Sequence, residues 1–133
     1  MSEAEEPTPE EQPLRALIID DEGHVRTILK EMLVRMELDV VDMGKNGLEA
    51  VELFHMHRPD LMLLDINMPV MTGEEALMVL MGDIGDTVVI MLTSMTDMRS
   101  VENCISMGAT NYIRKDTALD EIRQLIKDTL EMD

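Results

Sequence analysis

Aromatic residues are scarce in this sequence of 133 residues, which contains one tyrosine, one phenylalanine and no tryptophan. Small flavin-binding proteins use aromatic side chains to stack against the cofactor, and they carry a phosphate-binding loop rich in serine and threonine. The sequence supplies little that could stack on a flavin. A flavin-binding function is therefore disfavoured.

Basic residues are also few, with 11 lysines and arginines against 28 aspartates and glutamates. The formal net charge is -17 and the isoelectric point is about 4.3. Proteins that bind nucleic acids directly, or that lie on anionic membranes, need a basic surface. The composition argues against both functions and favours cationic partners and divalent metal ions.

A single cysteine, Cys104, excludes an internal disulfide. The first residues contain neither the basic stretch of a secretory signal nor a long apolar segment that could span a membrane. We therefore expect a cytoplasmic protein. A length of 133 residues with 45% hydrophobic content is typical of one domain with one core.

Residues 1–13 are rich in glutamate and proline and contain almost nothing to bury. We expect them to form a disordered acidic arm, followed by one folded domain over residues 14–133. No chemistry is assigned to the arm.

The rest of the sequence alternates short apolar segments with longer amphipathic ones. The apolar segments are too short for helices and are typical of strands buried on both faces; they cover residues 14–19, 39–43, 61–64, 88–92 and 112–114. The amphipathic segments predict helices over 25–38, from Asn46 to before Pro59, from Thr72, over 98–107 and after Thr117. Their apolar stripes include Ile28, Val79 and Leu119, which we expect to face the sheet.

Several predicted helix ends carry residues that ordinarily cap helices. Asn46 with Glu49, and Thr72 with Glu75, have the spacing of N-terminal caps. Gly108 suits the left-handed conformation that ends a helix. The segment from Thr117 to Asp120 is expected to cap the last helix.

Strands and helices that alternate in this way form an α/β domain, with a doubly wound five-stranded parallel sheet covered by helices on both faces. The crossovers are expected to be right-handed. Ligands bind to such sheets beyond the carboxyl ends of the strands.

Polar residues collect at that edge of the predicted sheet. Four strands end in polar groups although their interiors hold almost none, and the residues concerned are Asp20, Asp21, Asp65, Thr93, Ser94 and Lys115. A carboxylate after the apolar run 61–64 needs solvent, a cation or a reacting group beside it. Taken alone, Asp65 could serve only to turn the chain. The joint pattern favours a site.

The residue types at this edge indicate a particular chemistry. Three carboxylates in one place raise one another's pKa unless a cation lies among them. Oxygen ligands that leave positions open suit Mg²⁺, which bridges to phosphate oxygens. Lys115 offers a positive charge and Thr93 a hydroxyl donor for phosphoryl oxygens. The set predicts phosphoryl transfer to a carboxylate.

The sequence resembles the receiver domains of response regulators in two-component signalling, of the stand-alone, chemotaxis-regulator type. The resemblance covers residues 14–131 and rests on Asp20-Asp21, Asp65, Asn67-Met68-Pro69, Gly73, Thr93, Tyr112 and Lys115. It implies a flavodoxin-like fold of five βα units with strand order 2-1-3-4-5.

The resemblance also implies roles for the residues of the site. Asp65 is expected to accept a phosphoryl group from a histidine kinase, and Lys115 to contact that group. Asp21, Asp65 and the backbone carbonyl of Asn67 are expected to hold Mg²⁺, with Asp20 acting through water. The only catalysis implied is the chain's own phosphorylation and dephosphorylation.

Thr93 and Tyr112 are the switch pair that the resemblance implies. Phosphorylation is expected to change the affinity for a partner protein at the face formed by the helix 98–107, the strand 112–114 and the last helix. A monomer or weak dimer is expected. Whether the protein is an effector, a relay or a phosphate sink stays open.

One alternative and two local features complete the expectations. An aspartate-nucleophile phosphatase needs Asp-x-Asp directly after the first strand, and the segment 20–23 lacks that spacing. Asp116 stands where many receivers have a proline, and we expect a trans bond after Lys115 because a cis bond would cost about 2.5–4 kcal/mol. By resemblance, Asn67 and Met95 flank the path of water to the phosphoryl group, and Met95 is expected to shield it.

Overall fold

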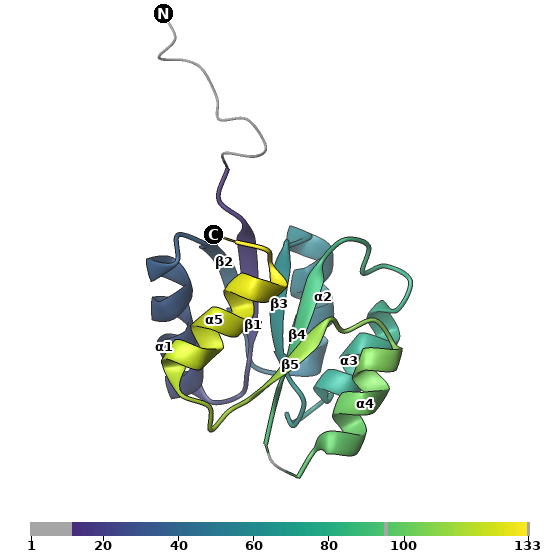
Figure 1. Cartoon of the computed structure of the whole chain (residues 1–133). Coiled ribbons are helices and arrows are strands. Elements are labelled where there is room, and N and C mark those ends of the chain that lie inside the picture. The colour runs from purple at the N-terminus through teal and green to yellow at the C-terminus, as the bar shows by residue number, and fades with distance from the viewer. Residues whose placement is uncertain (1–11, 95, 133) are drawn as a thin grey trace, which may run out of the picture.

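The computed structural model describes residues 12–94 and 96–132. Strands and helices alternate regularly along these residues (Figure 1). The elements are β1 (Arg15–Ile19), α1 (Gly23–Arg35), β2 (Asp39–Gly44), α2 (Gly47–His57), β3 (Leu61–Asp65), α3 (Gly73–Leu80), β4 (Val88–Thr93), α4 (Met98–Ser106), β5 (Asn111–Arg114) and α5 (Leu119–Thr129). Residues 1–11, which hold most of the predicted acidic arm, lie outside the described residues.

The five strands form one sheet in the order β2-β1-β3-β4-β5, and all neighbouring strands are parallel. The predicted fold class and strand order are confirmed. The chain runs from β1 outward to β2 and then returns to β3 on the other side of β1. The order therefore reverses between β1 and β3, which is where open α/β sheets bind ligands.

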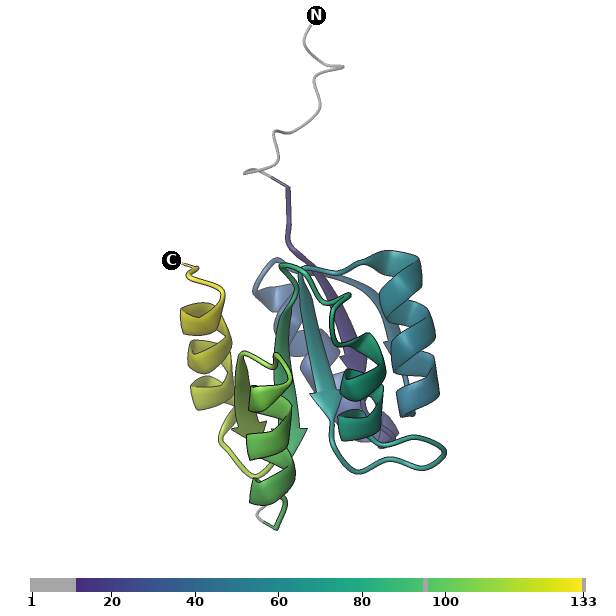
Figure 2. The same cartoon turned by 90° about the vertical axis from the view of Figure 1, so that its right-hand side faces the viewer.

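Helices cover both faces of the sheet, with α1 and α5 on one face and α2, α3 and α4 on the other (Figures 1 and 2). Successive residues of a strand point to opposite faces. Leu63 accordingly packs in the core under α1 and α5, and Leu64 in the core under α2, α3 and α4. The inner strands β1, β3 and β4 are buried on both sides, so their sequences are largely apolar rather than alternating, whereas the edge strands β2 and β5 are only partly buried and carry polar residues.

Local sequence accounts for several helix ends. The side chain of Asn46 accepts a hydrogen bond from the Glu49 amide, and Thr72 and Glu75 form a reciprocal capping box. Gly108, just after α4, has a φ of +118°, the left-handed conformation that glycine adopts without strain. These three predicted caps are confirmed.

Other expectations about the helices are corrected. The predicted helix over residues 25–38 runs instead from Gly23 to Arg35, because the chain turns at Glu37 and sends Leu38 into the core. Within the segment from Thr117 to Asp120, which the sequence predicts as the cap of α5, the N-cap residue is Ala118, and no side chain makes the capping hydrogen bond. The helix begins one residue later than a Thr117 cap requires.

The predicted apolar stripes include three residues that are exposed rather than buried. On α3 the inward face is set by Ala76, Leu77 and Leu80, and Val79 lies outside it at 54% exposure. Ile28 and Leu119 are also substantially exposed, although the stripes to which they belong face the sheet. Hydrophobic periodicity thus locates the helices but overestimates how much of each stripe is covered.

The strands run downward in Figures 1 and 2, so their carboxyl ends form the lower edge of the sheet. Gly73 closes the loop after β3 against this edge, and its amide donates to the Ile66 carbonyl. A Cβ at Gly73 would overlap the backbone carbonyl of Asp65. Within the described residues, no helix is long and apolar enough to cross a membrane.

Candidate functional site

Three carboxylates meet where β1 and β3 end. Ile19 pairs with Leu64 across the two strands, so the next residues along, Asp20 and Asp65, are neighbours. One oxygen each from Asp20, Asp21 and Asp65 lie within 4.8 Å of one another. Asp20 is fully buried and Asp65 is 3% exposed, whereas Asp21 is open to solvent. The prediction that these acids come together is confirmed by the geometry.

The ammonium of Lys115 lies among these carboxylates. Its Nζ is 2.9 Å from Asp20 Oδ2 and 3.0 Å from Asp65 Oδ2. The backbone holds the lysine in place, because the Lys115 amide donates to the Thr93 carbonyl at the end of the neighbouring strand. The peptide bond between Lys115 and Asp116 is trans, as expected.

The carboxylates of the cluster carry more negative charge than the one ammonium of Lys115 can neutralise. Burial, followed by the charge of Asp20, raises the pKa of Asp65 to about 7, although the bond from Lys115 opposes the rise. Burial alone would lower the pKa of Lys115, but its close contacts with the carboxylates of Asp20 and Asp65 outweigh burial and raise it. One ammonium therefore does not neutralise the carboxylates that surround it.

Glu22 is a third partner of Lys115 that the sequence analysis did not identify. Its Oε1 lies 3.0 Å from Nζ, and this hydrogen bond holds the pKa of Glu22 below its usual value. Glu22 follows the acidic pair directly, and its amide donates to Asp20 Oδ1. The sequence places Glu22 next to Asp20-Asp21, and this was the one signal that could have marked it as a site residue. Its contact with Lys115 depends on the geometry of the loop, which the sequence does not reveal.

The cluster fits a divalent cation. Within the described residues, the buried Asp20 Oδ2 receives no hydrogen bond, although Lys115 contacts it as an ion pair. A buried carboxylate oxygen without a directed partner is costly, and a cation would supply one. The donors are all hard oxygens, and Asp21 leaves the site open to solvent, which suits Mg²⁺ with its retained waters.

The site is hollowed at its solvent side. A cavity of about 360 Å³ is lined by Asp21, Glu22, Asp65, Asn67, Ser94, Asp97 and Lys115. Four of these seven residues are acidic and one is basic, so the cavity favours a ligand that arrives with a cation. An anionic group alone would meet a negative field.

A family comparison agrees with this geometry. Residues 16–127 match the family model described as the response regulator receiver domain. The chain belongs to this family. Receiver domains are signalling switches and not enzymes of the ordinary kind, and they bind Mg²⁺ at an acidic pocket like the one that Asp20, Asp21 and Asp65 form here.

Relatives of this receiver domain include short chains of nearly the same length. The chain is 35% identical over 116 residues to a chemotaxis protein CheY of Bacillus subtilis, covering 87% of this chain and 97% of the relative. Among solved structures, the response regulator domain of Thermotoga maritima CheB is 30% identical with a TM-score of 0.78, covering 90% of this chain and 95% of that one. CheY in a complex with CheX, BeF₃ and Mg²⁺ from Borrelia burgdorferi is 26% identical with a TM-score of 0.84, covering 91% and 92%.

Thr93 and Tyr112, the predicted switch pair, lie on the neighbouring strands β4 and β5. Thr93 is fully buried, and its hydroxyl donates to the Ser94 carbonyl at 2.9 Å rather than to a carboxylate of the cluster. Tyr112 is half-buried against the core under α2, α3 and α4. Tyr112 pairs with Met91, two residues before Thr93 on β4, and the role of the two residues as a switch pair stays a prediction.

Asn67 lines the acidic cavity, and its side-chain amide bonds Asp97 instead of a carboxylate of the cluster. Its amide nitrogen donates to Asp97 Oδ2 at 2.7 Å. Asp97 is a second residue that sequence analysis missed, because it follows β4 by four positions and nothing in the sequence ties it to Asn67. Met95, expected to shield the phosphoryl group, lies outside the described residues.

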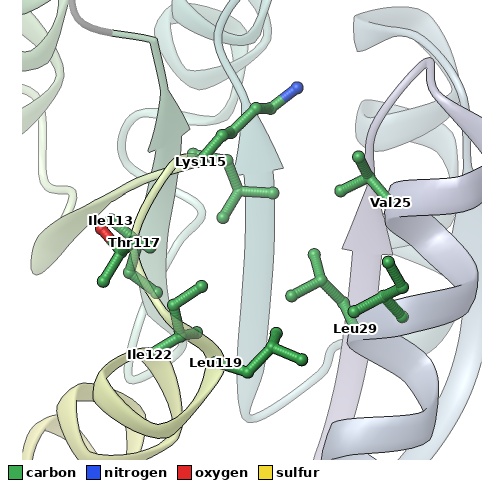
Figure 3. Close-up of a pocket in the computed structure, with 9 residues that line it drawn as sticks. Val25, Leu29, Ile113, Lys115, Thr117, Leu119 and Ile122 are labelled. Carbon is green, nitrogen blue, oxygen red and sulfur yellow. The ribbon is translucent and has the colours of Figure 1, made fainter.

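A second cavity, of about 240 Å³, lies between α1 and α5 and is mainly apolar. Figure 3 shows Val25 and Leu29 on one side and Leu119 and Ile122 on the other, with the ammonium of Lys115 pointing away from them. Lys115 therefore lines both cavities, with its stem in the apolar one and its charge at the carboxylates. The chemistry of the receiver domain belongs to the acidic cavity.

Cys104 and the two histidines of α2, His55 and His57, do not line the acidic cavity. Burial raises the pKa of Cys104 to about 11, so its thiol is unreactive at neutral pH. His57 bonds Asp42 at 2.9 Å and His55 bonds Asp83 at 3.3 Å. The two histidines thus face separate acids and do not share a site.

Proposed function

We propose that this receiver domain is a switch that accepts a phosphoryl group from a histidine kinase on Asp65, in the presence of Mg²⁺. The observation that carries the proposal is the contact of Lys115 with the buried carboxylates of Asp20 and Asp65, at the point where the strand order reverses. Asp65 is the carboxylate at the centre of this cluster, and it lines the open cavity. A phosphoryl donor can therefore approach it from solvent.

The chemical step moves one phosphoryl group between two nucleophiles. A carboxylate oxygen of Asp65 forms a bond to phosphorus while the bond between phosphorus and the donor's imidazole nitrogen breaks. The nitrogen keeps the electron pair and the acyl phosphate remains on Asp65. Lys115, which already bonds Asp65 Oδ2, is placed to neutralise the charge on the transferred oxygens.

Asp21, Asp65 and the backbone carbonyl of Asn67 would hold the metal in this proposal, with Asp20 acting through water. Bound Mg²⁺ supplies positive charge that offsets both the carboxylates and the phosphoryl oxygens. The same charge would oppose the two causes that raise the pKa of Asp65, burial first and then the charge of Asp20, and would favour the ionised, nucleophilic carboxylate at neutral pH.

The output is a change in affinity for a partner protein. A phosphoryl group on Asp65 offers acceptors to Thr93, whose hydroxyl then leaves the Ser94 carbonyl. The space that Thr93 vacates lets Tyr112 turn inward. The partner binds the face formed by α4, β5 and α5, and the chain acts as a monomer or weak dimer in the cytoplasm.

Phosphorylation by a small donor tests the proposal without the kinase. Acetyl phosphate with Mg²⁺ is expected to add one phosphoryl group, detected by intact mass, and chelation of Mg²⁺ is expected to prevent it. Asp65→Asn should take up none, whereas Asp86→Asn, at an exposed aspartate before β4, should behave as wild type. Uptake by Asp65→Asn would reassign the acceptor.

A further inference from the structure

Asp97 stands directly before α4 but does not cap it. Its carbonyl accepts the first helical bond, from the Val101 amide, which places Asp97 at the N-cap position. Aspartate at this position usually accepts a bond from the amides of the first turn. Here the carboxylate makes no such bond. Its hydrogen-bonding capacity is used elsewhere.

The carboxylate of Asp97 joins two loops of the site. Oδ2 accepts from Asn67 Nδ2 at 2.7 Å, in the loop after β3, and from Ser94 Oγ at 2.7 Å, in the loop after β4. The Ser94 amide makes a longer contact with the same oxygen at 3.4 Å. The Ser94 hydroxyl, and more weakly the Asn67 amide, lower the pKa of Asp97, so these bonds are charge-assisted at neutral pH.

Ser94 carries this connection to the switch threonine. Its hydroxyl is tied to Asp97, while its carbonyl accepts from Thr93 Oγ1 at 2.9 Å and from the Asp97 amide at 3.3 Å. The hydroxyl of Thr93 is thus engaged within its own loop. For this hydroxyl to reach a phosphoryl group on Asp65, its bond to the Ser94 carbonyl must break.

We propose that Asp97 is a positioning residue that latches the loop after β4 in its unphosphorylated arrangement. Through Ser94 it holds the loop in which Thr93 is engaged, and through Asn67 it anchors that loop to the one after β3. Asp97 also lines the cavity that contains Asp65, where its charge repels an incoming dianion. Both effects favour the unphosphorylated arrangement, so the latch opposes activation. The inference rests on the proposed function of Asp65 and Thr93.

The contacts of Asp97 suit a control element better than a support for the fold. Asn67 and Ser94 are exposed, and Asp97 is only half-buried. Polar pairs in such positions contribute about 0–1 kcal/mol each to stability. Removing the carboxylate should leave the fold intact, whereas a similar free energy applied to a two-state loop changes its populations severalfold.

The test compares beryllofluoride affinities, measured by calorimetry at fixed Mg²⁺. Asp97→Ala should bind about fivefold to tenfold more tightly than wild type, because tenfold corresponds to about 1.4 kcal/mol. Asp97→Asn keeps an acceptor oxygen without the charge, and its affinity for beryllofluoride should fall between those of wild type and Asp97→Ala. Asp86→Ala removes the same charge from an exposed position before β4 and should stay close to wild type.

A second readout follows the switch itself. Tyr112 is the sole tyrosine and the chain has no tryptophan, so its emission reports on this one ring. Without beryllofluoride, Asp97→Ala and the independent variant Ser94→Ala should already shift this emission toward that of the beryllofluoride complex. A residue that only stabilised the fold would lower the melting temperature without this shift.

The outcomes separate the latch from the function on which it rests. If wild type responds to beryllofluoride while Asp97→Ala and Ser94→Ala match Asp86→Ala, or bind more weakly, the latch is overturned. If wild type does not respond, or Asp65→Asn responds equally, the proposed function fails and the latch fails with it. Tighter binding with shifted Tyr112 emission in both variants supports the latch.

Discussion

Asp65→Asn should stabilise the protein when Mg²⁺ is absent, although it removes the proposed acceptor. Asp65 is 3% exposed and lies beside Asp20, and together these raise its pKa from 3.8 to about 7. An ionised Asp65 therefore costs free energy in the metal-free fold. Asparagine has a similar shape and no charge, and its carbonyl oxygen can still accept from Lys115.

The magnitude follows from the pKa. The difference between 3.8 and about 7 corresponds to about 4 kcal/mol, at 1.36 kcal/mol for each pH unit. Relaxation of the site and the weaker bond from Lys115 to a neutral amide reduce this gain, so we expect about 2 kcal/mol. For a chain of this size, such a gain raises the melting temperature by roughly 6–10 °C.

The stability advantage of Asp65→Asn over wild type should depend on pH, and the raised pKa of Asp65 sets the direction of that dependence. A carboxyl group with a raised pKa in the fold contributes stability below its ordinary pKa and loses that contribution as pH rises through the folded value. The advantage of Asp65→Asn should therefore be small near pH 4, grow as pH rises from 3.8 through about 7, and be complete at higher pH.

Urea denaturation in EDTA, at several pH values, measures this advantage. Asp86→Asn, at an exposed aspartate, controls for the loss of one charge from a chain of net charge -17. Millimolar Mg²⁺ should reduce the difference in the free energy of unfolding between Asp65→Asn and wild type, because Mg²⁺ binds the folded wild type. Equal stabilities of wild type and Asp65→Asn above pH 7, or a gap that does not depend on pH, would refute the reasoning.

Three further predictions concern the rest of the site. Asp21→Ala should abolish the rise in melting temperature that Mg²⁺ gives wild type, and an equal rise in both would mean that the metal acts only on surface charge. Thr93→Ala should still be phosphorylated by acetyl phosphate but should no longer change Tyr112 emission; an unchanged response would remove Thr93 from the switch. Gly73→Ala should cost about 3 kcal/mol in urea denaturation because its Cβ overlaps the Asp65 carbonyl, and a loss below about 1 kcal/mol would show that the loop yields.

The sheet and the position of the site could be predicted because they depend on patterns along the chain. The short apolar run before Asp65 is typical of a strand buried on both faces, and parallel strands bring their carboxyl ends to one edge. Asp20, Asp65 and Lys115 consequently meet in the structure. Asn46 caps α2 as predicted because capping depends on residues three positions apart.

The partners that the sequence did not reveal depend on how loops turn. Asp97 bonds Asn67 across 30 positions of sequence, and Glu22 bonds Lys115 across 93. Both acids lie in loops whose side-chain directions are set by tertiary contacts and not by a period. The segment from Thr117 to Asp120 has residue types that fit a cap, but the backbone places Ala118 at the N-cap of α5, and alanine has no side-chain oxygen to accept a hydrogen bond.

The central claim is that Asp65 receives the phosphoryl group, and position-specific chemistry tests it most directly. Borohydride reduces an aspartyl phosphate to homoserine, which leaves a permanent mark in the chain. After treatment with acetyl phosphate and Mg²⁺, reduction and peptide mass spectrometry, we predict homoserine at position 65 and intact aspartate at positions 20 and 21. Homoserine at either of those positions, or its absence from position 65 in phosphorylated protein, would contradict the account.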